Sequence, residues 1–204
     1  RVLMADVLII KLSALGDLVQ ADGAMHDIRS HHDGDRITVM TTPPYRKFME
    51  KCPWVDEVFI DHRFPRYHLL QMARLRREIK AKRFDRVYDL QQVGRTRFYC
   101  RWLFPRTRWL GDVPGCWCYL ERGKDQCAQD HFAAHLKRAG IDVNYTLHSD
   151  VSWMAENVAE LLNNEKLEPG YVLLVPGASA SHPEKRWPYY RELAHLLLNK
   201  GFQT

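Results

Sequence analysis

The sequence lacks the long apolar run that a membrane-spanning helix needs. A span takes about 20 consecutive apolar residues, and no run in this chain approaches that length. The apolar part of the first ten residues, RVLMADVLII, is short, and Lys11 follows it directly, unlike a secretory signal peptide. We therefore expect a chain without a membrane span, with the cytoplasm as its default location.

The sequence also lacks cysteine pairs with the spacing of a metal-binding or redox motif. It has five cysteines, an odd number, and no two have CxxC spacing. Cys116 and Cys118 are too close for a zinc knuckle, and no nearby residues complete a ligand set. The sequence therefore predicts reduced thiols, mostly packed in the interior, and no metal site.

Acidic residues are scarce in one part of the chain. Between Asp61 and Leu110, fourteen Lys or Arg face four Asp or Glu, a local balance of +10 in a chain whose net charge is +5. This segregation indicates an anionic partner, which is nucleic acid, a phosphorylated glycan or a membrane surface, or else a solvated basic helix face. Neither an RNA-binding aromatic signature nor zinc-knuckle spacing supports nucleic acid.

What is present is enough for a packed core, because 46% of the 204 residues are hydrophobic and six are Trp. Val7–Ile10 is a short, continuously apolar run that predicts a strand buried on both faces. Lys11–Gly16 predicts a tight turn, and a helix follows. The apolar stripe of this helix is formed by Leu18, Ala21, Met25 and Ile28.

This unit places Ser13, Gly16 and Asp17 at the carboxyl end of a strand, the edge at which open α/β sheets bind ligands. A carboxylate beside a helix N-terminus is favoured in its ionised form and can act as a general base. The alternative is that Asp17 only begins the helix.

Strand and helix patterns alternate along the next hundred residues, which predicts a parallel, doubly wound sheet. Strands are expected at residues 36–41, 55–60, 86–90 and 106–110, and helices at 45–51, 67–83, 94–103, 130–138 and 150–163. Within the helix at 130–138, His131 and His135 share one face as a metal pair without a third ligand, so packing is the simpler interpretation.

The pattern then restarts. A polar stretch over 164–170 predicts a domain boundary, with domains at 1–165 and 166–204. Tyr171–Val175 predicts a buried strand, residues 176–181 a loop of small residues, and Tyr190, Leu193 and Leu197 a helical stripe. One strand and one helix cannot bury their own apolar faces, so we expect the second domain to be truncated.

Three motifs together resemble glycosyltransferase family 9, the ADP-heptose:lipopolysaccharide heptosyltransferases. They are IIKLSALGD near the N-terminus, VYDLQQVGRTR at Val87–Arg97, and VPGASASHPEKRWP in the second unit. The resemblance implies an α/β fold of the GT-B type, with two Rossmann-like domains. It implies an acceptor site in the first domain and an ADP-sugar site in the second. The reaction would invert the anomeric carbon without a cofactor or a catalytic metal.

The resemblance also implies roles for single residues. Asp17 would be the general base, and Ser13 and Gly16 would let the backbone approach the substrates. Lys185 would offset charge on the departing diphosphate, a role that Arg186 could share. The alternative for Lys185 is a solvent-facing loop lysine. Gly177 and Ser179 would contact phosphate, and Gln91, Gln92 and Arg95 would contact the acceptor or simply form loop structure.

The partners implied are ADP-heptose or a related nucleotide sugar, an anionic lipopolysaccharide-core acceptor, and the inner face of the inner membrane, with no nucleic acid. Because the family's later nucleotide-sugar segment is absent, we expect little activity from residues 1–204 alone. Two alternatives stay open: a non-catalytic glycolipid- or nucleotide-binding module, and a transferase that uses another sugar nucleotide.

Overall fold

The computed structural model describes residues 4–123, 125–178, 180 and 183–204. The chain divides into two compact units, Arg1–Ala155 and Glu156–Thr204, and each is described by itself. The predicted boundary at residue 165 stays a prediction.

The first unit contains a six-stranded sheet in which all neighbouring strands are parallel, in the order β3-β2-β1-β4-β5-β6. The strands are β1 (Asp6–Ile10), β2 (Arg36–Thr41), β3 (Glu57–Ile60), β4 (Arg86–Asp89), β5 (Arg108–Gly111) and β6 (Cys118–Tyr119). The order reverses between β1 and β4, which is the switch point of a doubly wound sheet. The predicted parallel sheet is therefore confirmed.

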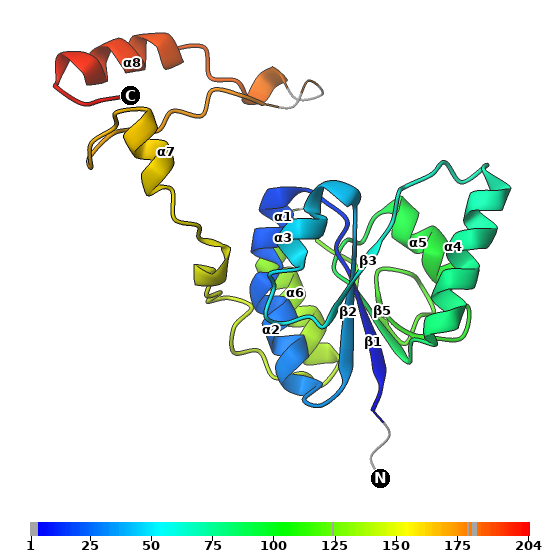
Figure 1. The fold of residues 1–204 in the computed structure, drawn as a ribbon. Coiled ribbons are helices and arrows are strands. Elements are labelled where there is room, and N and C mark those ends of the chain that lie inside the picture. Colours follow the sequence, from blue (N-terminus) through cyan, green and yellow to red (C-terminus); the bar gives the residue numbers. More distant parts are fainter. Residues whose placement is uncertain (1–3, 124, 179, 181–182) are drawn as a thin grey trace. The chain divides into compact units, whose positions relative to one another are not determined.

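Helices cover both faces of this sheet (Figure 1). One face carries α1 (Leu15–Gln20), α2 (Asp22–His31), α3 (Arg46–Met49) and α6 (Ala128–Arg138). The other face carries α4 (Leu69–Lys82) and α5 (Gly94–Trp102). A 3-10 turn, η1 (Pro43–Tyr45), precedes α3. Val7 and Ile9 of β1 belong to the first core, and Leu8 and Ile10 to the second. A strand buried on both faces needs an uninterrupted apolar run, as the sequence predicted.

Some predicted helix details need correction. The single helix expected after residue 17 is two helices that meet at Ala21, although all four predicted stripe residues are buried. In α4 the stripe residues Met72, Leu75 and Ile79 are buried, but Leu69 is 77% exposed because it begins the helix beyond the sheet contact. Strand β6 was not predicted, because two residues are too few to show a period of two.

A buried carboxylate fastens the segment after α6 to α2. The Asp27 carboxylate accepts hydrogen bonds from the backbone N–H groups of Asn144 (2.9 Å), Tyr145 (3.0 Å) and Thr146 (2.9 Å). It also accepts one from the Thr146 hydroxyl at 2.6 Å. Space is short here, since a Cβ added at Gly23 would lie 2.1 Å from the Tyr145 carbonyl oxygen.

We expect Asp27→Ala to lower the free energy of unfolding by about 3–5 kcal/mol, because it leaves four donors without their acceptor, two of them the buried N–H and hydroxyl of Thr146. Urea denaturation followed by tryptophan fluorescence measures this. Asp33→Ala, at an exposed position in the turn after α2, is the control and should change stability by less than about 0.5 kcal/mol. Equal effects in the two variants would contradict the assignment.

The second unit contains α7 (Ala159–Asn164), the 3-10 turn η3 (Pro183–Lys185) and α8 (Tyr190–Asn199). The helix predicted over 150–163 forms only in its last part, as α7, which begins at Ala159. A 3-10 turn, η2 (Ser152–Met154), and an extended segment precede α7. Asp150 and Asn157 accept the N–H groups of residues two positions on, at 3.0 and 2.9 Å, and such local bonds compete with a helix.

The strand predicted at Tyr171–Val175 is also wrong. Its one recorded main-chain bond to a distant residue runs from the Val172 N–H to the Gln203 carbonyl at 2.8 Å, and no strand of the described residues lies beside it. An apolar run without neighbouring strands has no ladder to join. None of the helices in the described part of the chain has the length and apolarity that a bilayer crossing requires.

Candidate active site

The candidate site lies where the sheet order reverses, at the carboxyl ends of β1 and β4. The Gln91 side-chain oxygen after β4 accepts the backbone N–H groups of Leu12 (2.8 Å) and Ser13 (3.2 Å) after β1. Asp89 accepts the N–H groups of Gln91 (3.1 Å) and Gln92 (2.9 Å) in turn. The two predicted loops are therefore held side by side, and the Gln91 carbonyl group is committed to that contact.

Asp17 stands in the first turn of α1. Its carboxylate accepts the Ala14 N–H at 2.9 Å, and the side chain is exposed. It lines a cavity of about 340 Å³ at this edge of the sheet, together with residues that follow β1, β4, β5 and β6. Asp17 therefore begins the helix and also faces a cavity, so its role as a general base stays a prediction.

Ser13 and Gly16 lie on either side of this helix start. The Ser13 hydroxyl accepts from the Arg63 guanidinium at 3.5 Å and lines a neighbouring cavity of about 360 Å³. A Cβ added at Gly16 would meet nothing within 4 Å. Packing within the first unit therefore does not require a glycine at position 16. A requirement for glycine there would come from the close approach of a ligand.

Lys11 is a cavity residue that the sequence analysis missed. It follows β1 directly and is only 5% exposed. Its Nζ donates to the Leu90 carbonyl at 3.1 Å and lies 5.6 Å from the Phe132 ring centroid. No ion pair joins it to a carboxylate of the described residues, although buried lysines are rare unless paired.

Burial lowers the pKa of the Lys11 ammonium, and the carboxylates of Asp17 and Asp89 partly offset this. An ammonium has three donors, and one is occupied by Leu90. Because Lys11 lines the same cavity as Asp17, the remaining donors are available to an anionic or hydroxyl-bearing ligand. A lysine immediately after an apolar strand is the signal that could have identified it.

The two histidines of α6 belong to a directional hydrogen-bond chain. His131 Nε2 donates to the side-chain oxygen of Gln92 at 2.7 Å. The side-chain nitrogen of the same Gln92 donates to His135 Nδ1 at 3.1 Å. His135 Nε2 donates to the Cys118 carbonyl at 2.9 Å. The His135 ring is thus neutral, because its Nδ1 accepts a hydrogen bond, and both rings and the Gln92 side chain are engaged in the chain. No cluster of three or more metal-ligating side chains occurs among the described residues.

The buried His131 predicts a pH-dependent stability. Burial and the nearby His135 and Arg122 lower its pKa from 6.5 to about 4, while Asp112 opposes them. The unfolded chain therefore binds this proton below about pH 6.5 and the folded chain does not, so stability is lost as pH falls. Urea denaturation should show a decrease from pH 7.5 to 5 that is about 2 kcal/mol larger in the wild type than in His131→Gln. Equal decreases would contradict this.

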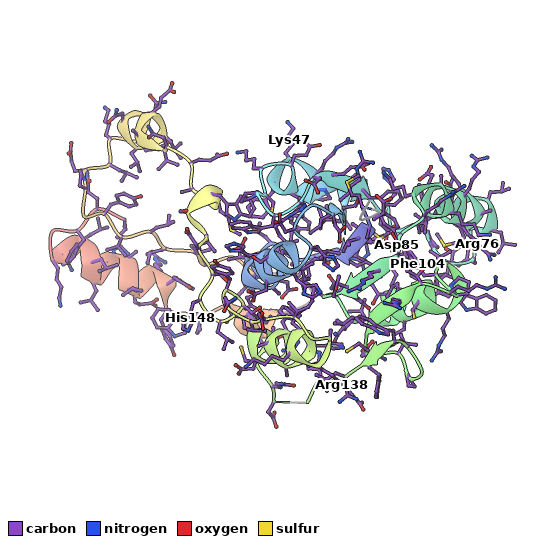
Figure 2. All side chains as sticks on the ribbon, turned by 90° about the horizontal axis from the view of Figure 1, so that it is seen from below. Lys47, Arg76, Asp85, Phe104, Arg138 and His148 are labelled. Atoms are coloured by element: carbon purple, nitrogen blue, oxygen red, sulfur yellow. The ribbon has the colours of Figure 1, made fainter. Side chains whose placement is uncertain are left out.

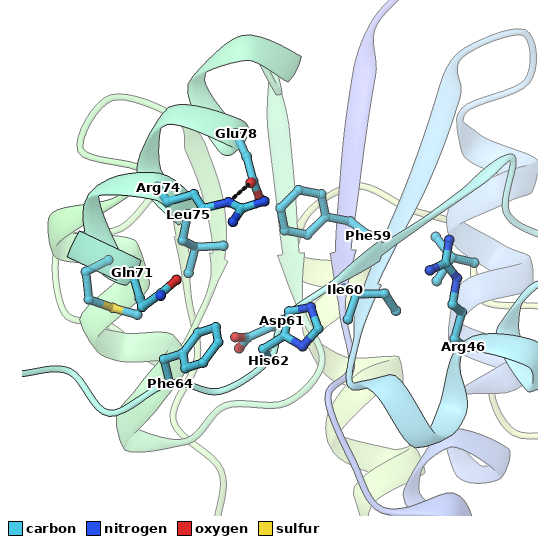
Figure 3. A pocket seen from close by; sticks show the side chains of 12 residues that line it. Arg46, Phe59, Ile60, Asp61, His62, Phe64, Gln71, Arg74, Leu75 and Glu78 are labelled. Atoms are coloured by element: carbon cyan, nitrogen blue, oxygen red, sulfur yellow. Dashed lines mark hydrogen bonds and ion pairs between the residues drawn. The ribbon is translucent and has the colours of Figure 1, made fainter. Parts of the chain in front are cut away.

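Arg95, a predicted acceptor contact, is committed to the interior of the first unit. Its guanidinium donates to Tyr99 (2.6 Å), Asp61 (3.3 Å) and the Phe64 carbonyl (2.7 Å). It thereby fixes the segment after β3, which lines a cavity of about 410 Å³ beside α4. Asp61, Phe64 and Leu75 all face this cavity (Figure 3). Arg95 can shape an acceptor pocket without touching its occupant.

The remaining predicted residues lie in the second unit. Lys185 ends η3 and is exposed. The Arg186 guanidinium donates to the Ala178 carbonyl at 3.3 Å, which ties this segment to the loop that contains Gly177. A Cβ at Gly177 would meet nothing within 4 Å, and Ser179 lies outside the described residues. Among the described residues, Gly177, Lys185 and Arg186 therefore belong to one local segment of the chain.

Chemically, the first-unit site combines a proton acceptor with a buried cation. Asp17 can remove a proton from a hydroxyl group, and the Lys11 ammonium can hold an anionic group in the same cavity. The arrangement suits the activation of a hydroxyl on an anionic acceptor.

Comparison with known sequences agrees with this arrangement. Residues 72–204 match the sequence model of the family described as "Glycosyltransferase family 9 (heptosyltransferase)". No match was found among curated protein sequences.

Solved structures share the fold. A family 9 glycosyltransferase from Veillonella parvula DSM 2008 matches with a TM-score of 0.76 and 22% identity, over 97% of this chain and 60% of that chain. E. coli ADP-heptose LPS heptosyltransferase II matches at 0.66 and 20%, over 97% and 62%. E. coli heptosyltransferase WaaC with ADP-2-deoxy-2-fluoro heptose matches at 0.64 and 18%, over 97% and 67%. The chain thus spans about three fifths of the first two structures, and the predicted GT-B-type α/β fold is confirmed.

Proposed function

This chain belongs to glycosyltransferase family 9, and on that basis we propose that it is part of an inverting glycosyltransferase. The protein transfers heptose from ADP-heptose to an anionic acceptor of the lipopolysaccharide inner core at the inner face of the inner membrane. An E. coli relative of the same fold was solved with ADP and with an ADP-heptose analogue, which supports the choice of donor. No resident cofactor is needed.

The observation that carries this proposal is the shared cavity of Asp17 and Lys11 at the switch point of the sheet. Asp17 takes the proton of the acceptor hydroxyl as that oxygen attacks the anomeric carbon. The bond from this carbon to the diphosphate breaks, and ADP leaves with the electron pair. Attack opposite to the leaving group inverts the configuration.

Lys185 is our candidate for the cation that offsets the charge of the departing diphosphate. Arg186, Gly177 and Ser179 are candidates for phosphate contacts in the second unit. Ser13 and Gly16 are candidates for close substrate approach. Gln91, Gln92 and Arg95 act on the acceptor indirectly, since their recorded contacts hold the loops that border the cavities.

A non-catalytic binding module is the second candidate function, and it is favoured by the exposed, easily reached position of Asp17. The test is to incubate the intact protein with ADP-heptose and a Kdo–lipid A acceptor and to follow ADP release. Release that requires acceptor supports the transferase. Acceptor binding without ADP release supports the non-catalytic binding module. Release of nucleotide only with another sugar nucleotide shows that the protein is a transferase with a different donor.

A further inference from the structure

Another groove lies at the opposite edge of the sheet from the cavity that Asp17 lines. It has a volume of about 480 Å³ and is lined by the second half of α4 and by the segments that follow α4 and α5. Phe84, two residues before β4, and Thr107, directly before β5, line it, so the groove borders the amino ends of these strands. Arg76 and Phe104 lie close together at this end of the first unit (Figure 2).

The rim of the groove is cationic. Arg76, Lys80, Arg83 and Arg106 line it and are exposed, and no Asp or Glu lines it. The nearby Asp85 is not a lining residue, and its carboxylate accepts the Asp6 N–H at 2.9 Å. Four cations without a carboxylate form a site whose charge complements a phosphate group.

These four residues differ from four other basic residues of the Asp61–Leu110 segment, which form ion pairs inside the first unit. The recorded ion pairs of that segment are Arg74–Glu78 at 2.9 Å, Lys82–Glu57, Arg95–Asp61 at 3.3 Å and Arg97–Asp112 at 2.6 Å. No ion pair among the described residues involves any of the four groove cations. Part of the local excess of positive charge is therefore concentrated, unpaired, at this groove.

Behind the cations the groove is apolar. Its floor is formed by Ile79, Phe84, Leu103 and Phe104, all of them buried core residues. Trp102, next to Leu103 in the chain, is 63% exposed. Exposed tryptophan beside clustered Lys and Arg is typical of segments that sit at an anionic membrane surface. Recognition of single-stranded nucleic acid would instead need aromatic stacking platforms in the groove, and the two aromatic lining residues are buried.

We propose that this groove binds the phosphate headgroup of an anionic membrane lipid and docks the α4–α5 side of the first unit on the bilayer. The inference rests on the proposed function for its choice of a membrane as partner. Strands of four or five residues separate the two edges of the sheet by roughly 15 Å, so the groove and the Asp17 cavity can be occupied at the same time. The groove is thus distinct from the acceptor site.

The test is co-sedimentation of the intact protein with vesicles at low ionic strength. We expect binding to vesicles that contain phosphatidylglycerol and none to phosphatidylcholine alone. Each Lys or Arg near an anionic surface contributes about a fivefold change in partitioning. The triple variant Arg76→Gln, Lys80→Gln, Arg106→Gln should therefore weaken binding by about a hundredfold. Arg83 is retained because it follows α4 directly in the left-handed conformation, with a positive φ.

A matched control removes three exposed cations elsewhere: Lys47→Gln, Lys137→Gln and Arg138→Gln. Lys47 and Arg138 lie far from Arg76 (Figure 2), and this triple variant should stay within about fivefold of the wild type. Equal losses in the two triple variants would overturn the proposal, as would undiminished vesicle binding by the groove variant. Binding of single-stranded DNA that the groove variant alone loses, without vesicle binding, would assign the groove to nucleic acid instead.

Two further measurements separate loss of lipid binding from misfolding and from failure of the transferase assay. If the circular dichroism of the triple variant differs from that of the wild type, the single variant Arg106→Gln, located in the loop before β5, replaces it and should lower partitioning about fivefold. The vesicle assay contains no nucleotide sugar, so failure of the transferase assay leaves its outcome unaffected. Loss of vesicle binding likewise leaves soluble-acceptor turnover unchanged if the two sites are separate.

Discussion

Asp17→Asn should reduce the turnover number of the intact protein by about a thousandfold, within the range of 10²–10⁴ typical of general-base catalysis. The amide oxygen of asparagine can still accept the Ala14 N–H, the bond that Asp17 makes at 2.9 Å, so the start of α1 should keep its structure. What the variant loses is the ability to take a proton. Acceptor-dependent ADP release measures the effect.

The matched control is Asp33→Asn, an exposed carboxylate in the turn after α2, which should leave turnover unchanged. We expect the Asp17→Asn protein to bind both substrates with little change in affinity, because the lost interaction belongs to the transition state. Full turnover in this variant would remove Asp17 from the base role. Lost turnover together with lost acceptor affinity would make Asp17 a binding residue.

The sequence predicted the sheet well because its signals are local. The run Val7–Ile10 can be satisfied only between two apolar layers, and the structure places alternate residues in two separate cores. The position of Asp17 at a cavity follows from the same logic, since the turn after a buried parallel strand opens at the ligand-binding edge.

Contacts between distant segments could not be read in the same way. Gln92 looks like a loop residue until α6 places His131 and His135 against it, 39 and 43 positions later. Arg95 looks free until the segment after β3 supplies Asp61 and the Phe64 carbonyl. Such partners are fixed by topology, and no local pattern encodes them. The strand predicted at Tyr171–Val175 failed for the related reason that a strand depends on its neighbours.

Lys11→Met should separate stability from function. Methionine matches the length of the lysine stem and removes an ammonium whose pKa is lowered by burial, so the desolvation cost of that charge disappears. The hydrogen bond to the Leu90 carbonyl (3.1 Å) is lost in exchange. These opposing changes should leave the melting temperature unchanged or slightly raised, measured by calorimetry.

The activity of the same variant should fall. A hydrogen bond to a charged group contributes about 1.5–3 kcal/mol, so kcat/KM for the anionic acceptor should drop roughly 10-fold to 150-fold, while KM for the nucleotide sugar stays constant. Lys47→Met, at an exposed site on α3, is the matched control and should change neither quantity. A large fall in melting temperature would mark Lys11 as a structural residue. An unchanged acceptor KM in a stable variant would exclude acceptor binding. Because a buried, unpaired lysine is costly to keep, a variant that is at least as stable but less active would show that position 11 holds a charge for the sake of a ligand.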